Sequence, residues 1–185
     1  MRPGTFRLTS VLAVVLLGCL TMSAPASADS NHNGRLTFMR QDSAGLWQVW
    51  VANADLTKQQ QLTNEAANSG WPVWSPDGRK IAFDTDRGDP DRTDETAIND
   101  IYTMNANGRN LRNLTLNEAP NGSADPVWSP DGNKILFLQA IVQNDQFSAG
   151  LATMNPDGSD RHFISSTPTE QHQPDWQPTC RKCNT

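Results

Sequence analysis

Short apolar runs alternate along the chain with polar segments that contain Gly, Pro, Asn or Asp. In the run 46–53, for example, Trp47, Val49 and Val51 occupy every second position. A period of two is typical of a strand with one buried face, and clusters of turn-forming residues are typical of strand connections. No helical periodicity is visible after residue 28, so the pattern predicts an all-β protein.

One turn motif organises this pattern, because it occurs almost unchanged in residues 71–83 and 125–137. Ser-Pro-Asp-Gly has the residue preferences of a type I turn, and its Gly can adopt the positive φ that a hairpin bulge requires. Each copy therefore predicts a strand, a tight turn and a second strand. The motif residues are Trp74, Ser75, Pro76, Asp77, Gly78, Trp128, Ser129, Pro130, Asp131 and Gly132, with Trp176 in a partial third copy. We expect its three Trp side chains to pack between neighbouring sheets.

If A is the strand before this turn and B, C and D are the strands after it, the chain has the order BCD-ABCD-ABCD-A. This order predicts three four-stranded antiparallel sheets, in which residues 174–177 supply the A strand that the first sheet lacks. Repeats of about fifty residues indicate stacked sheets, such as the blades of a β-propeller. The expected strands are 34–38, 46–53, 59–63, 71–75, 80–85, 100–104, 110–115, 126–129, 134–139, 150–154, 162–166 and 174–177.

Three blades are fewer than the roughly four to eight that propellers normally contain. An open arc of three sheets would leave the apolar faces of its end sheets uncovered, which repeat proteins avoid by capping. We therefore predict a homodimer in which two chains join head to tail into a six-bladed ring. In that ring, strand A of one chain would complete the first sheet of the other.

The Trp-Ser-Pro-Asp-Gly motif, followed by an Ile-Tyr-x-Met-Asn segment and a Leu-Thr pair, resembles the PD40, or WD40-like, repeat of the TolB family. The resemblance covers residues 29–179, which we assign to propeller repeats, and leaves 180–185 as a tail. It implies four-stranded blades around a channel, a periplasmic or extracellular location, and protein binding. In the Tol-Pal system such a propeller contacts an outer-membrane lipoprotein.

The first 28 residues have the features of a secretory signal peptide: basic residues, the apolar run Leu8–Leu20, and Ala-Ser-Ala before Asp29. A second interpretation stays open, because Leu-Leu-Gly before Cys19 matches a lipobox, in which that Cys is lipidated. Both interpretations predict export to the periplasm, the cell surface or the medium. We expect membrane attachment only if Cys19 is lipidated.

The balance of charge disfavours a nucleic-acid partner. Removing residues 1–28 takes away two of the 15 basic residues and none of the 20 acidic ones, which leaves a net charge of −7. Phosphate binding requires the opposite sign.

Acidic residues gather in the connection from Asp84 to Asp100. We interpret it as a solvated surface loop that offers partner contacts. Closely spaced carboxylates also allow Ca²⁺ binding, although the spacing matches no EF-hand loop. Its candidate residues are Asp84, Asp86, Asp89, Asp91, Asp94 and Asp100.

Two further features are candidates for a site. Asp125 and Asp175 lie beside Pro at the entry to an A strand, where they either bind a cation or a basic peptide or hydrogen-bond their own turn. Cys180 and Cys183 form a C-x-x-C pair without the second pair that a zinc site needs. In an exported protein this pair predicts a disulfide, within the chain or between two chains.

The sequence therefore favours a non-catalytic binding module for an envelope or extracellular protein or peptide. It contains no G-x-S-x-G elbow, no H-E-x-x-H and no phosphate-binding glycine run, and we expect no catalytic residues, resident metal or cofactor. Two alternatives stay open: a metal-assisted, carbohydrate-active or hydrolytic propeller enzyme, and a degenerate fragment of a longer propeller.

Overall fold

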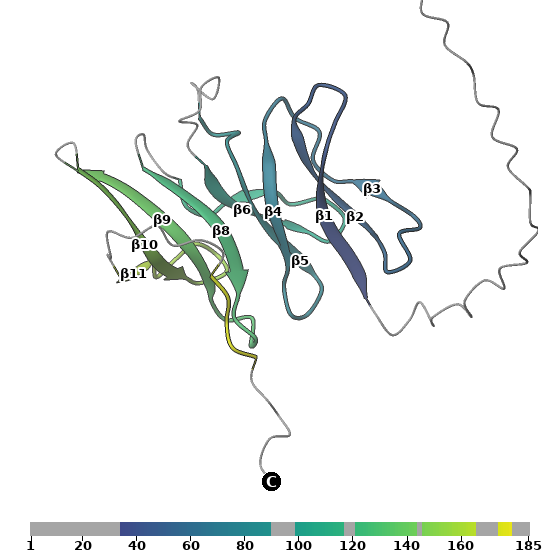
Figure 1. The fold of residues 1–185 in the computed structure, drawn as a ribbon. Helices are drawn as coiled ribbons and strands as arrows, with labels where there is room; N and C mark the ends of the chain where they lie inside the picture. Colours follow the sequence, from purple (N-terminus) through teal and green to yellow (C-terminus); the bar gives the residue numbers. More distant parts are fainter. Residues whose placement is uncertain (1–33, 90–98, 117–120, 144–145, 166–173, 179–185) are drawn as a thin grey trace, which may run out of the picture.

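The computed structural model describes residues 34–89, 99–116, 121–143, 146–165 and 174–178. This part of the chain forms three antiparallel β-sheets, stacked in sequence order (Figure 1). Strands of the first sheet contact β4 of the second, and β4, β5 and β6 of the second sheet contact β8 of the third. The described ranges contain no helix, and therefore none that could span a membrane. The all-β prediction is confirmed.

The sheets have the orders β1-β2-β3, β4-β5-β6-β7 and β11-β10-β9-β8, so β4 and β8 are edge strands. Apart from the last A strand, this is the predicted order BCD-ABCD-ABCD. The strands are β1 (Arg35–Gln41), β2 (Trp47–Asn53), β3 (Gln60–Gln61), β4 (Ser69–Trp74), β5 (Lys80–Thr85), β6 (Asp100–Asn105), β7 (Arg112–Asn113), β8 (Gly122–Trp128), β9 (Ile135–Gln143), β10 (Gln146–Met154) and β11 (His162–Ser165).

The first sheet differs from the other two because its A position is empty among the described residues. Residues 174–178 pair with none of the described strands, although the sequence predicts a strand there. In the other two sheets the A strand pairs with the B strand, and the B strand of the first sheet is β1, which pairs only with β2 among the described residues. In Figure 1, β1 and the third sheet stand at opposite ends of the stack, and the segment lies beside the third sheet. One chain therefore does not bring the two together.

The two Ser-Pro-Asp-Gly segments form the expected turns. The backbone N–H of Gly78 donates to the Ser75 carbonyl at 2.8 Å, and Gly132 donates to Ser129 at the same distance. Both glycines have positive φ, of 69° and 73°. The Ser75 hydroxyl donates to Asp77 at 2.6 Å and holds the pKa of that carboxyl below its ordinary value. The motif's Ser and Asp therefore stabilise the turn, as the sequence indicates.

The core lies between the sheets. Phe83, with Trp74 packed against the same cluster, fills the space between the first and second sheets, and Phe137 with Trp128 fills the space between the second and third. This confirms the expected packing of these two Trp side chains between sheets. Burying aromatic side chains of this size is the main source of stability available to such a stack.

Candidate functional site

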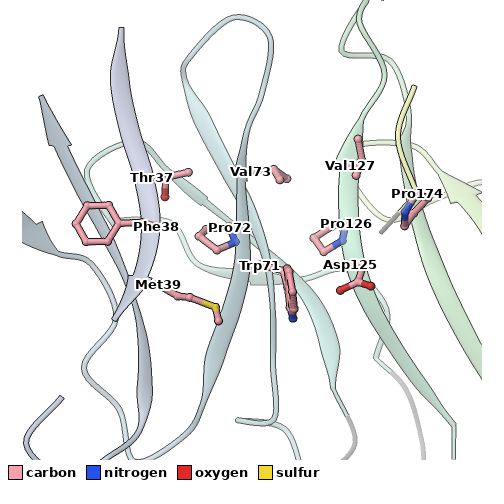
Figure 2. A pocket seen from close by; sticks show the side chains of 10 residues that line it. All are labelled: Thr37, Phe38, Met39, Trp71, Pro72, Val73, Asp125, Pro126, Val127 and Pro174. Atoms are coloured by element: carbon pink, nitrogen blue, oxygen red, sulfur yellow. The ribbon is translucent and has the colours of Figure 1, made fainter. Parts of the chain in front are cut away.

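A cavity of about 390 Å³ opens where the first strand of each sheet faces its neighbour. It is lined by residues 37–39 of β1, 71–73 of β4 and 125–127 of β8, together with Pro174 (Figure 2). Most of these side chains are apolar, and three of them are prolines. The cavity therefore joins all three sheets and combines a stiff apolar wall with very few polar groups.

Trp71 and Asp125 occupy equivalent places on neighbouring strands of this cavity (Figure 2). In each strand the pairing register shifts at this point, so that two residues oppose one on the next strand. Such a bulge commonly redirects a side chain beside a site. Trp71 has a φ of 47° and Asp125 a φ of 53°, a region that non-glycine residues rarely adopt. Each such residue costs on the order of 1–3 kcal/mol, so the repetition indicates a conformation that the surrounding fold maintains.

The two redirected residues offer different chemistry. Trp71 is 47% exposed, which is unusual for a Trp side chain on a strand of the middle sheet. Asp125 is half-buried and carries the one acidic group among the cavity-lining residues. An aromatic face and a carboxylate on adjacent strands can together hold a cationic or amphipathic side chain.

Asp84 fixes the backbone of Asp125 from the neighbouring sheet. Its carboxylate accepts a hydrogen bond from the Asp125 backbone N–H at 3.1 Å, and Asp84 is only 3% exposed. Burial raises the pKa of Asp84 to about 7, against the lowering effect of this hydrogen bond, and the charges of Asp125 and Asp86 add to the rise. The equivalent residue of the third sheet is Leu138, so this contact is not a general feature of the repeat.

The other acidic candidates of this segment have structural roles. Asp86 accepts hydrogen bonds from the backbone and side chain of Asn68, at 2.8 and 3.0 Å. Asp100 accepts from Asn113 and Thr115, both at 2.6 Å. The interpretation as a solvated loop is wrong for Asp84, Asp86 and Asp100, which are 3%, 2% and 6% exposed, because each carboxylate binds donors inside the fold.

Two further candidates, Asp89 and Asp175, do not line the cavity. Asp89 is half-buried beyond the end of β5, and Asp175 accepts a hydrogen bond from the backbone N–H of Trp176 at 2.8 Å. The candidates outside the described residues are Asp91, Asp94, Cys19, Cys180 and Cys183. Within the described ranges, no group of three or more His, Cys, Asp or Glu residues could hold a metal ion. Calcium binding stays an untested prediction.

An Arg guanidinium lies over the Phe at the equivalent position of each of the three sheets, which the sequence did not indicate. The guanidinium of Arg40 lies 5.2 Å from the ring centre of Phe38, and Arg87 lies 5.6 Å from that of Phe83. In the third sheet Arg161 lies 5.9 Å from Phe137. The three Arg residues come from different places in the repeat, so no sequence spacing reveals them.

Trp71 is a further site residue that the sequence did not single out. The sequence did contain a hint, because Trp71 precedes Pro72 and Asp125 precedes Pro126 at the same place in the two copies of the repeat. It was not decisive, since the residue before a Pro normally adopts an extended conformation, and only the bulge turns these two side chains into the cavity.

The comparisons with known proteins agree with this architecture. Over 97 residues the chain is 35% identical to the uncharacterized peptidase YuxL of Bacillus subtilis, a match that covers 52% of this chain and 13% of that protein. Over 133 residues it is 33% identical to the Tol-Pal system protein TolB of Anaeromyxobacter dehalogenans, covering 71% of this chain and 27% of that protein. The chain thus spans well under half the length of these relatives.

A solved structure has the same fold. The structure of a protein assigned as TolB from Agrobacterium tumefaciens superposes with a TM-score of 0.57 at 19% identity, covering 71% of this chain and 45% of that chain. The sequence model of the PD40 family, which is described as the TolB beta propeller domain, matches residues 20–183 of this chain. The chain therefore belongs to the TolB beta propeller domain (PD40) family, and its repeated turn and three blade-like sheets agree with that membership.

Proposed function

We propose that this chain is an exported, non-catalytic binding module that holds a protein or peptide of the cell envelope or the extracellular space in the cavity between its inner strands. The observation that carries the proposal is the pair of bulges that turn Trp71 and Asp125 into that cavity. Strained conformations persist where a fold maintains them, and they cluster at ligand sites. The family membership and the signal-like first 28 residues support the proposal.

The cavity chemistry indicates the kind of peptide. Pro72 and Pro126 form stiff apolar walls that lose little conformational freedom on binding. Trp71 offers the large aromatic surface that dominates binding energy at interfaces. Asp125 favours a basic side chain over an acidic one. The site therefore suits an extended segment with a Lys or Arg next to an apolar residue.

Binding of this kind requires rigid display rather than movement. Asp125 is held through its backbone by Asp84 of the next sheet, and Trp71 is held by the equivalent bulge. A cavity formed in advance lowers the entropic cost of binding.

Photo-crosslinking tests the proposal. A photoreactive phenylalanine analogue replaces Trp71 in one variant and Leu56, an exposed residue outside the cavity, in the control. Irradiation of cells that export each variant should give a discrete polypeptide adduct at position 71 and none at position 56. A synthetic peptide made from the adduct's sequence should bind the wild type, and the Asp125→Asn variant should weaken binding roughly tenfold, because a charge-assisted contact is lost.

Two results would refute this function. One is the absence of any polypeptide adduct at position 71 when the variant is folded and exported. The other is turnover of a peptide or glycan by the purified chain, which would instead favour the enzymatic alternative.

A further inference from the structure

The outer surfaces of the first and third sheets differ from those inside the stack. Leu36 is 40% exposed, whereas the equivalent Ile81 and Ile135 of the next two sheets are 0% exposed. Phe38 is half-buried, whereas its equivalents in β5 and β9 are completely buried. These are equivalent positions, because the pairing of β1 with β2 has the same register as that of β5 with β6. The first sheet therefore has an apolar face and a strand edge that the described residues leave uncovered.

The third sheet has the complementary exposed face. Leu138 and Leu151 pair across β9 and β10 and are half-buried, whereas Ile101, the equivalent of Leu151 in the second sheet, is 0% exposed. In the second sheet this face packs against the sheet that follows. The third sheet thus has an apolar face prepared for a following sheet.

Residues 174–178 lie where the first strand of a following sheet belongs. Figure 2 shows β1, β4, β8 and Pro174 side by side in that order, and Pro174 lines the cavity with β8. Pro174 and Trp176 have the same spacing as the Pro and Trp of β4 and of β8. The segment therefore has the sequence and the place of an A strand, but no B strand beside it among the described residues.

We propose that residues 174–177 pair with the free edge of β1 in a second copy of this chain, and that two reciprocal pairings close a six-bladed ring. In this arrangement the exposed face of one copy's first sheet packs on the exposed face of the other copy's third sheet. Within one chain, β4 and β8 stand between this segment and β1 (Figure 2), so the segment cannot reach the edge of β1 in the same chain.

The repeat also fixes the register of this pairing. In the second sheet Val73 lies opposite Ala82, and Trp74 lies opposite Ile81. The equivalent pairs between two copies are Asp175 with Thr37, and Trp176 with Leu36. Six blades fall within the range of about four to eight that closed propellers use. The proposal goes beyond the peptide-binding function and does not depend on it.

A disulfide trap tests both the partner and the register. Two variants of the full chain, Thr37→Cys and Asp175→Cys, are made in a background in which Cys19, Cys180 and Cys183 are Ser, so that the introduced thiol is the only one in each chain. Directly opposed residues of antiparallel strands lie about 4.5–5.5 Å apart, within the range a disulfide bridges. Mixing the two variants under mild oxidation should give a reducible dimer that contains one of each, whereas neither variant alone should give it.

A matched pair of Trp substitutions tests the energetics. Trp176→Ala should raise the dimer dissociation constant roughly a hundredfold or more, because the substitution removes a large aromatic contact from both pairings. Trp47→Ala is the control, since Trp47 is 39% exposed and lies at the end of β2 far from Leu36. It should leave the constant within about threefold of the wild type.

Three results would overturn the proposal. The first is a monomer mass for the native chain at micromolar concentration, measured by light scattering. The second is a disulfide formed within one chain of the Thr37→Cys, Asp175→Cys double variant. The third is a native dimer that gives no mixed disulfide, which would mean that another surface joins the copies. None of these results affects the adduct expected at Trp71, so the two proposals fail separately.

Discussion

The buried carboxyl of Asp84 should make the protein less stable as the pH rises from 4 to 7. Its pKa is about 7 in the folded chain and near 3.8 ordinarily, because burial disfavours its charged form. Between these values the folded state holds a proton that the unfolded state has released. A group with a raised acidic pKa therefore stabilises the fold at low pH, and this stabilisation is lost as the pH rises through the folded pKa.

The size of the effect follows from the two pKa values. Each pKa unit corresponds to about 1.4 kcal/mol, so the total change is about 4 kcal/mol. More than half of this change should fall between pH 5 and pH 8, because the folded pKa lies inside that window. At 3% exposure the carboxyl has little solvent to reduce this value.

Asp84→Asn removes the ionisation but keeps an oxygen that can accept from the Asp125 N–H. We expect the variant to show a flat free energy of unfolding between pH 5 and pH 8 where the wild type declines. At pH 8 it should be more stable than the wild type, since no charge is buried. Urea unfolding followed by Trp fluorescence, at one fixed protein concentration, measures both.

Asp157→Asn is the matched control. Asp157 is exposed, and its hydrogen bond from Ser159 lowers its pKa, so it contributes stability that is lost only as the pH falls below about 4. This variant should keep the wild-type slope between pH 5 and pH 8. The reasoning is refuted if Asp84→Asn also keeps that slope, or if it is less stable than the wild type at pH 8.

Two further predictions concern packing and backbone conformation. Phe137→Ala should lower the free energy of unfolding by about 3–5 kcal/mol, because the side chain is 0% exposed, whereas Phe163→Ala, at 39% exposure, should cost about 1 kcal/mol or less; denaturant midpoints measure both. Gly158→Ala should destabilise the fold by more than about 2 kcal/mol, because its φ is +87° and the new Cβ would lie 2.7 Å from the Leu114 carbonyl oxygen. Gly45→Ala, with a φ of +82° and no atom within 4 Å, should cost only about 1 kcal/mol in the same assay. Equal losses at the two glycines would show that the close approach to Leu114 has no energetic weight.

Much of the fold could be predicted because its information is local. Ser75, Pro76, Asp77 and Gly78 specify a turn through their own hydrogen bonds and backbone preferences, and the same four residue types repeat at 129–132. The alternation around each turn then assigns the flanking strands. Expected strands and observed strands differ mostly at their ends, and the outer strands β3 and β7 are only two residues long.

The site depended on relations between sheets, which local patterns do not contain. Asp84 was expected in a solvated loop because it stands among other carboxylates, but the next sheet covers it and its acceptor oxygen faces the Asp125 N–H. Trp71 was expected only as the first residue of a strand, and the register shift of β4 is what turns its side chain into the cavity.

The sequence by itself determined the repeated turn, the strand order and the family, because each follows from residues close together in the chain. Only the tertiary structure decided which carboxylate is buried, which side chains meet in the cavity, and which sheet edge the described residues leave unpaired. Those outcomes depend on how one sheet lies against another, and burial, the pKa of a carboxyl and a free β-edge are properties of that packing rather than of any single segment.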